Sequence, residues 1–291
     1  MIELDGIGKL TSPVIIAAFE GWNDAGEAAS GVINHLGLAW QATPVGAIDP
    51  EDYYDFQVTR PVTEVGEGRT ERLIWPTTRL LAAKQEASDR DLLLVHGIEP
   101  NMRWRGFCSE LVTSFSELGI ELVVLLGALL ADSPHTRPVP VAAAASDPAL
   151  AAELHVEPVE YKGPTGIVGV LQHACAQAGI AAVSLWASVP HYVAAAPNPK
   201  AALALVRKLE GLVGVSVDAG ELESAAADYE RQVSLAVQSD PDVQAFVERL
   251  EQAAEEEEPP VSPQDLPSGD TIAREFQRFL RQRGPEAGGP G

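Results

Sequence analysis

Short apolar runs recur along the chain, and they constrain its fold more than any other sequence feature. Each is five to seven residues long and is followed, after a polar loop, by a segment with helical or second-strand character. Strands buried on both faces of a parallel sheet have this composition. Strands that alternate with helices predict an α/β fold with a mostly parallel sheet and helices on both faces. The runs are residues 13–19, 91–95, 120–126 and 181–187.

The acidic charge of the chain argues against nucleic acid or an anionic membrane as a partner. The formal net charge is −22, and the 20 Lys and Arg residues are scattered, whereas phosphate contacts need clustered basic side chains. Residues 221–258 contain twelve acidic and two basic residues, so almost half of the net charge lies in about an eighth of the chain. We expect this part to form an acidic helical annex to the α/β core.

Shifts in composition predict the organisation of the chain into segments. Patterned apolar residues indicate a folded core, and the run of Glu and Pro after residue 254 is typical of an extended linker. The predicted segments are an α/β core (1–217), an acidic helical extension (218–254), a charged Pro-rich linker (255–269), a C-terminal amphipathic helix (270–283) and a disordered tail (284–291).

The same reading predicts a cytoplasmic protein without a metal or a cofactor. The first residues lack the basic and apolar regions of a signal peptide. The longest apolar run, residues 122–131, is far shorter than the roughly 20 residues that span a bilayer. The two cysteines, Cys108 and Cys175, belong to no CxxC or Cys/His cluster, so neither disulfides nor a zinc site is expected.

Polar side chains follow the predicted strands where these enter loops. Ligands of open parallel sheets bind outside the carboxyl ends of the strands, so residues from several strands are expected to converge there. This convergence predicts a ligand or partner site formed by Asn23, Asp24, Glu99, His135, Arg137, Thr165, His191 and Tyr192.

Each of these residues also has a structural alternative. Asp24 is more often a helix cap than an acid at such a position. His135 and His191 are either acid/base groups or hydrogen-bonded structural histidines. Arg137 either clamps an anion or neutralises a nearby carboxylate. Thr165 is expected to cap the helix that starts after it, where free N–H groups attract anions; a plain tight turn with a cap is the alternative.

Established catalytic signatures are missing. No Gly-x-Gly-x-x-Gly follows the first strand, and neither a Gly-x-Ser-x-Gly elbow nor a His-Glu-x-x-His motif occurs. These patterns would have indicated dinucleotide binding, an α/β-hydrolase and a zinc protease. The catalytic residues, if the chain is an enzyme, are therefore not identified by motif.

Several segments together resemble the proteasome assembly chaperone family, in a bacterial branch. They are residues 20–28, 126–128, 134–138, 161–166, 184–192 and 269–281. The resemblance implies an α/β core similar to nucleoside phosphorylases, a homo-oligomer (dimer or trimer), a protein partner and no cofactor. Members of this family commonly dock on the proteasome through a C-terminal hydrophobic-Tyr-x tail. This chain ends in Gly-Gly-Pro-Gly, so docking of that kind is not expected.

Two functions are consistent with these observations. The first is a non-enzymatic protein-binding or assembly-chaperone-like scaffold, which the resemblance and the missing catalytic motifs favour. The alternative is an enzyme or binder of a small anionic ligand, nucleoside-like or phosphorylated, at the carboxyl ends of the strands. In that case His135 or His191 would act as the acid/base and Arg137 would hold the anion.

Overall fold

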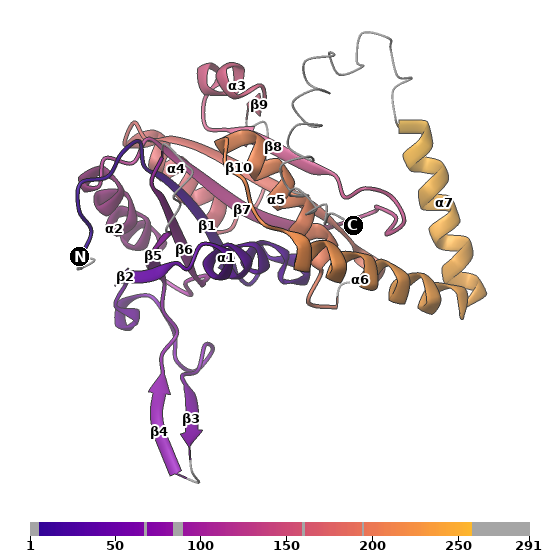
Figure 1. Cartoon of the computed structure of the whole chain (residues 1–291), viewed down its shortest axis with the longest axis horizontal. Helices are drawn as coiled ribbons and strands as arrows, with labels where there is room; N and C mark the ends of the chain where they lie inside the picture. Colours follow the sequence, from indigo (N-terminus) through magenta and orange to yellow (C-terminus); the bar gives the residue numbers. More distant parts are fainter. Residues whose placement is uncertain (1–5, 67–68, 84–89, 159–160, 194, 258–291) are drawn as a thin grey trace, which may run out of the picture. The chain divides into compact units, whose positions relative to one another are not determined.

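A computed structural model describes residues 6–66, 69–83, 90–158, 161–193 and 195–257 (Figure 1). The chain divides into two compact units, residues 1–251 and 252–291, and the following account concerns the first. The predicted C-terminal helix (270–283), the tail (284–291) and the linker beyond residue 257 lie outside the described residues.

The core is an eight-stranded sheet in the order β2-β5-β6-β1-β7-β10-β8-β9. Its four central strands, β6, β1, β7 and β10, are parallel, while β5, β2 and β8 join antiparallel. This confirms the predicted α/β fold with a mostly parallel sheet. The strands are β1 (Val14–Glu20), β2 (Thr43–Ala47), β5 (Arg79–Ala83), β6 (Leu92–Ile98), β7 (Leu122–Ala131), β8 (Val141–Ala145), β9 (Glu157–Pro158) and β10 (Ala181–Pro190).

Helices cover both faces of this sheet, because alternate residues of each central strand point to opposite sides. Val14 and Ile16 of β1 pack in one apolar cluster with α1 (Ala28–Ala39) and α5 (Pro199–Val213). Ile15 and Phe19 pack in the other with α2 (Trp104–Glu117) and α4 (Ile167–Gln177). Each fully buried large apolar side chain contributes about 1.5–3 kcal/mol to folding, which explains why the strands are apolar on both faces. A short helix, α3 (Pro148–Leu154), lies beside β8.

Two acidic helices follow the sheet, as the charge pattern predicted. They are α6 (Gly220–Gln238) and α7 (Pro241–Glu257), and Pro241 occupies the first helical position, where its missing N–H is harmless. The helix α6 packs against α5. Val233, Val237 and Val247 form a small apolar cluster with residues that directly follow β10. This cluster connects the acidic helices to the carboxyl end of the sheet.

A separate β-hairpin extends from the sheet between β2 and β5 in the sequence (Figure 1). It consists of β3 (Val62–Gly66) and β4 (Arg69–Ile74). The apolar runs that predicted the central strands did not predict β3, β5 or β8. The strands β5 and β8 contain consecutive Ala residues, which are uncommon in strands, and most of β3 is exposed.

Membrane-spanning helices and clusters of metal ligands are both absent from the described residues. No helix in this part of the chain combines the length and the apolar character that a bilayer crossing requires. In the same residues, no three His, Cys, Asp or Glu side chains gather as metal ligands would.

Candidate functional site

The loop after β1 contacts the loop after β6 through Asn23 and Glu99. The Asn23 Nδ2 donates to the Glu99 Oε1 at 2.7 Å, and the Asn23 side chain is only 1% exposed. The same Glu99 oxygen accepts a hydrogen bond from the Ile167 backbone N at 2.8 Å, at the first residue of α4. Glu99 therefore supplies the negative charge that the N-terminus of this helix favours.

This arrangement corrects the prediction for Thr165. The N-cap of α4 is Gly166, which makes no side-chain capping bond, and Thr165 is exposed. A side chain at position 166 would collide with Asn23, since an added Cβ would lie 2.4 Å from the amide atoms of that residue. The anion expected at this helix start is thus the carboxylate of Glu99, which lies 68 residues earlier in the chain.

Asp24 serves as a helix cap, which confirms the structural alternative for this residue. Its Oδ1 accepts hydrogen bonds from the backbone N of Ala29 at 2.7 Å and of Ser30 at 3.2 Å, in the first turn of α1. Asp24 is buried, and burial raises the pKa of its carboxyl group. The two hydrogen bonds oppose this shift but do not cancel it.

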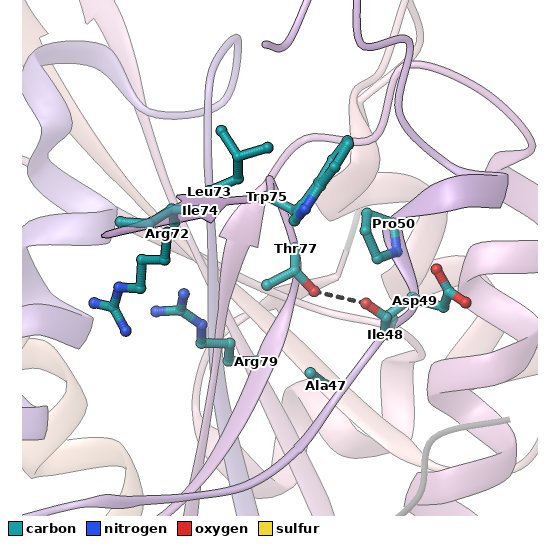
Figure 2. Close-up of a pocket in the computed structure, with 10 residues that line it drawn as sticks. All are labelled: Ala47, Ile48, Asp49, Pro50, Arg72, Leu73, Ile74, Trp75, Thr77 and Arg79. Atoms are coloured by element: carbon teal, nitrogen blue, oxygen red, sulfur yellow. Dashed lines mark hydrogen bonds between the residues drawn. The ribbon is translucent and has the colours of Figure 1, made fainter. Parts of the chain in front are cut away.

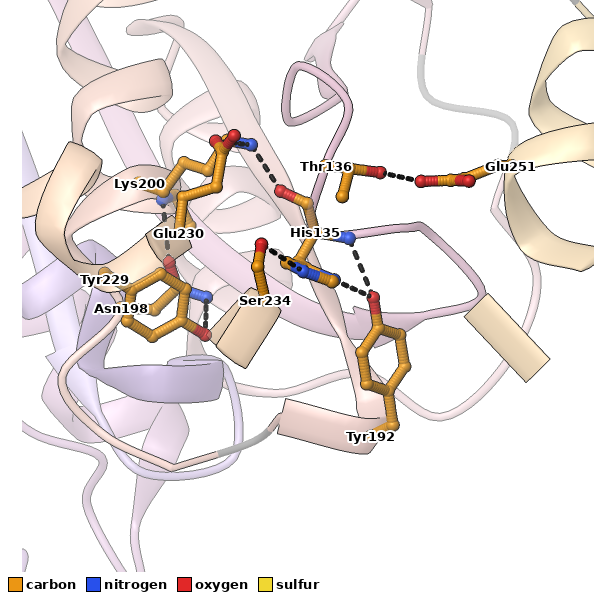
Figure 3. A network of polar contacts seen from close by, with 10 residues as sticks. His135, Thr136, Tyr192, Asn198, Lys200, Tyr229, Glu230, Ser234 and Glu251 are labelled. Carbon is orange, nitrogen blue, oxygen red and sulfur yellow. Dashed lines mark hydrogen bonds and ion pairs between the residues drawn. The ribbon is translucent and has the colours of Figure 1, made fainter. Parts of the chain in front are cut away.

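His135 and Tyr192 come from the loops after β7 and β10 and contact each other (Figure 3). The Tyr192 hydroxyl lies 2.8 Å from both the backbone N and the Nδ1 of His135. The other ring nitrogen, Nε2, lies 3.1 Å from the hydroxyl of Ser234 on α6. Either neutral tautomer of the imidazole satisfies both contacts. The His135 ring thus connects the sheet to the first acidic helix.

The same loop makes further polar contacts with the acidic helices (Figure 3). The His135 carbonyl oxygen accepts a hydrogen bond from Lys200 Nζ, and Lys200 forms an ion pair with Glu230 of α6 at 2.5 Å. The Thr136 hydroxyl donates to the Glu251 carboxylate of α7. Three side chains from α6 and α7 are therefore bound directly or through Lys200 to this one loop.

His191 lies on the other side of Tyr192. Its Nδ1 is 3.0 Å from the Asp132 Oδ1, and its ring packs edge-on against Tyr192 and Phe246 of α7, with centroids 5.9 and 5.5 Å apart. The two Pro-His loops thus meet at Tyr192 within one chain. Arg137 is half-buried in the same loop as His135.

The predicted residues accordingly form two groups. Asn23, Asp24 and Glu99 organise the starts of α1 and α4, with Thr165 next to the second of these. His135, His191 and Tyr192 attach the acidic helices, with Arg137 in the His135 loop.

The chemistry available to His135 is limited by its surroundings. The side chain is buried, with 3% of the residue exposed, and both ring nitrogens already have partners. Burial lowers the pKa of the imidazole, and the nearby Lys200 charge lowers it further. A neutral, buried and fully hydrogen-bonded histidine is suited to holding structure together, because a general base needs a nitrogen within reach of substrate.

Two hollows at the root of the hairpin were not predicted from the sequence. The larger has a volume of about 600 Å³ and lies between β4 and the segment after β2 (Figure 2). The smaller, of about 230 Å³, includes Glu20 and His96 at the ends of β1 and β6. Trp75 and Arg79 line both. The available signal was a Trp-Pro pair between Arg72 and Arg79 in a strongly acidic chain.

Glu20 and His96 interact at the edge of the smaller hollow. The Glu20 Oε1 lies 3.3 Å from the His96 Nε2. A hydrogen bond with His96 lowers the pKa of the Glu20 carboxyl group, although partial burial opposes the shift. The pair therefore keeps Glu20 ionised beside the hollow.

The chain is an α/β protein with a mostly parallel sheet and two acidic helices attached at the strand ends. It matches the PAC2 family over residues 18–237, and it belongs to that family. No curated protein matches the chain.

Solved structures of this family resemble the chain over most of its length. A PAC2 family protein from Streptomyces avermitilis is 53% identical, with 81% of this chain and 99% of that chain covered and a TM-score of 0.76. A proteasome-assembly chaperone homologue from Mycobacterium tuberculosis is 49% identical, with 80% and 99% covered and a TM-score of 0.75. An archaeal proteasome activator from Pyrococcus furiosus, at 16% identity and a TM-score of 0.66, with 81% and 98% covered, shares the fold.

Proposed function

We propose that the chain is a non-enzymatic scaffold that binds other proteins and assists their assembly. Membership of the PAC2 family and the similarity to a proteasome-assembly chaperone homologue support a role of this kind. We further propose that it works in the cytoplasm as a homo-oligomer and without a cofactor. Two free, buried cysteines suit a reducing compartment.

One observation carries the proposal: most polar residues at the strand ends make contacts within the chain, although the Asn23 Oδ1 and the Asp24 Oδ2 are buried without a hydrogen-bond partner among the described residues. Glu99 binds Asn23 and the first N–H of α4. His135 uses its backbone N and both ring nitrogens within the chain. A site evolved for chemistry keeps such groups available to substrate. Here they position helices, whose outer surfaces remain for protein contacts.

The alternative of a small anionic ligand draws less support from this arrangement. Of its two proposed acid/base residues, His135 is buried and fully hydrogen-bonded, whereas His191 is exposed and pairs with Asp132. The helix N-terminus that would have attracted a phosphate already binds the Glu99 carboxylate. An added anion would meet that carboxylate directly, and like charges at this distance repel.

Affinity capture from the native cell extract tests the proposal. The full chain serves as bait, and each captured protein is then purified and titrated against it. We expect at least one partner to bind at a fixed stoichiometry in the micromolar range or tighter. The chain should raise the yield of an assembled complex while being absent from the finished product. Failure of every captured protein to rebind after purification contradicts the proposal.

A further inference from the structure

The β3–β4 hairpin exposes more apolar surface than a two-stranded sheet can support alone. Val62 and Val65 are 63% and 61% exposed, and Leu73 and Trp75 are 50% and 42% exposed. Isolated hairpins are marginally stable in water, and contiguous exposed apolar residues mark interaction surfaces. We therefore expect the exposed apolar side chains of the hairpin to bind another protein surface.

The root of the hairpin carries more basic than acidic side chains, since Asp49 lines one hollow and Glu20 the other beside the arginines, in a chain that is otherwise strongly acidic. Arg60 and Arg79 line the hollows beside Trp75, and neither forms an ion pair within the described residues. Figure 2 shows the guanidinium groups of Arg72 and Arg79 on the same side of the hollow, and Arg72 forms an ion pair with Glu64. A tryptophan flanked by unpaired arginines is typical of the residues that dominate binding energy at protein interfaces. Trp75 and Arg79, which line both hollows, would bind a partner surface that carries acidic groups and an apolar side chain.

The acidic helices of the same chain have that chemistry. Glu221, Asp242 and Glu248 of α6 and α7 are exposed and have no cationic partner in the described part of the chain. Leu235 of α6 is 62% exposed. Residues 221–258 carry −10 of the net charge of −22. Negative potential on one surface and positive potential on the other would steer the two together.

These two surfaces are attached to different strands of the sheet, four strand spacings apart. The hairpin leads into β5, whereas α6 and α7 attach to the loops after β7 and β10. Three strands, β6, β1 and β7, separate β5 from β10. At about 4.8 Å per strand, this separation is about 19 Å across a rigid core.

We propose that the root of the hairpin binds the acidic helices α6 and α7 of a second copy of this chain. Such a contact joins different surfaces of the two copies, and repetition closes a ring when the rotation allows it. The inference deepens the homo-oligomer part of the proposed function by naming the two surfaces. A protein partner of the oligomer could still bind elsewhere.

Charge reversal at Arg79 tests this contact in the full chain. Light scattering after size exclusion, over a range of protein and salt concentrations, gives the dissociation constant for self-association. We expect Arg79→Glu to weaken self-association by roughly tenfold or more, and added salt to weaken that of the wild type. Arg105→Glu is the matched control, because Arg105 is exposed on α2 and undergoes the same change of charge. Circular dichroism and urea unfolding check that both variants fold.

Mixing two variants with complementary charge reversals tests whether the root of the hairpin binds α6 and α7. A second variant carries Glu221→Arg, Asp242→Arg and Glu248→Arg. Each variant alone should be mainly monomeric, and the mixture with Arg79→Glu should recover association, in species that contain both variants. Equal dissociation constants for self-association of Arg79→Glu and Arg105→Glu would overturn this inference. The proposed scaffold function would remain intact. A wild-type chain that stays monomeric at its highest soluble concentration overturns the inference and the homo-oligomer together.

Discussion

The hydroxyl group of Tyr192 lies 2.8 Å from both the backbone nitrogen and the Nδ1 of His135. One side chain thus satisfies two polar groups of a buried loop, at the point where the acidic helices join the sheet. This relationship explains why the two Pro-His loops meet. It also predicts which substitutions affect the attachment of α6 and α7.

Tyr192→Phe should loosen that attachment. The change leaves the buried N–H and ring nitrogen of His135 without a partner, which costs about 1–3 kcal/mol. Urea unfolding should report the loss of stability, and amide hydrogen exchange should rise in α6 first. Tyr161→Phe is the matched control, since Tyr161 is 69% exposed, and it should change stability by less than about 0.5 kcal/mol. Equal effects of the two substitutions would contradict the assigned role of Tyr192.

His135 should make the stability depend on pH. Burial, assisted by Lys200, lowers the pKa of its imidazole in the folded protein below the ordinary value of 6.5. The unfolded chain then binds more protons between the two pKa values, so stability is lost as the pH falls below about 6.5. Unfolding free energies measured from pH 7.5 to 5.5 for the wild type and for His135→Gln check this. The variant should have the shallower dependence, and a steeper one would refute the assignment.

Gly166→Ala should be strongly destabilising. The added Cβ would lie 2.4 Å from the amide atoms of Asn23, so Asn23 must shift and its bond to Glu99 must weaken. We expect a loss of about 1–3 kcal/mol, as for other overpacked sites. Gly37→Ala is the matched control, because no atom lies within 4 Å of a Cβ at that helical position. This control should stabilise the protein by up to about 1 kcal/mol.

Glu99→Ala and Glu99→Gln should separate the charge of this residue from its hydrogen bonds. Alanine removes the acceptor for both Asn23 and the Ile167 N–H, which should cost about 1–2 kcal/mol. Glutamine keeps an acceptor oxygen at the helix start and loses only the charge, which should cost about 0.3–1 kcal/mol. Thermal or urea unfolding measures both. A glutamine variant less stable than the alanine variant would show that Glu99 has another role.

The two cysteines should be unreactive until the protein unfolds. Burial raises the pKa of Cys108 and of Cys175 to about 12, and only the thiolate reacts with alkylating reagents. Labelling with iodoacetamide at pH 7.5, followed by mass spectrometry, should modify neither thiol in the native protein and both in urea. Rapid labelling of either cysteine in the native protein would show that α2 or α4 opens readily.

The parts of the fold that the sequence predicted correctly are those with strong local patterns. Four buried strands and the helices between them follow from continuous apolar runs and helical spacing, and the acidic pair was evident from its charge. Four of the five residues of the strand β3 are exposed, and its polar and apolar residues do not alternate, so nothing in its pattern indicates which surface it covers. The strands β5 and β8 were missed for another reason, because their consecutive Ala residues are uncommon in strands.

The candidate site was predictable only in its membership. Sequence position placed Asn23, Glu99 and His135 at strand ends, but their partners lie far away in the chain. Glu99 caps a helix 68 residues later, and the ring of His135 binds Ser234, 99 residues later. No local rule selects such a partner over Thr165, which stands beside the helix start. The distinction between an open site and internal contacts therefore required the structure.

Native mass spectrometry of the chain, purified gently from its own cells, tests the central claim most directly. A protein-binding scaffold should appear in complexes that contain at least one other polypeptide at a fixed stoichiometry. Denaturing the same sample should release only polypeptides. The contradicting result is a chain found alone or only with copies of itself, in which each copy carries a small anionic molecule that denaturation releases. That result would favour the ligand-binding alternative.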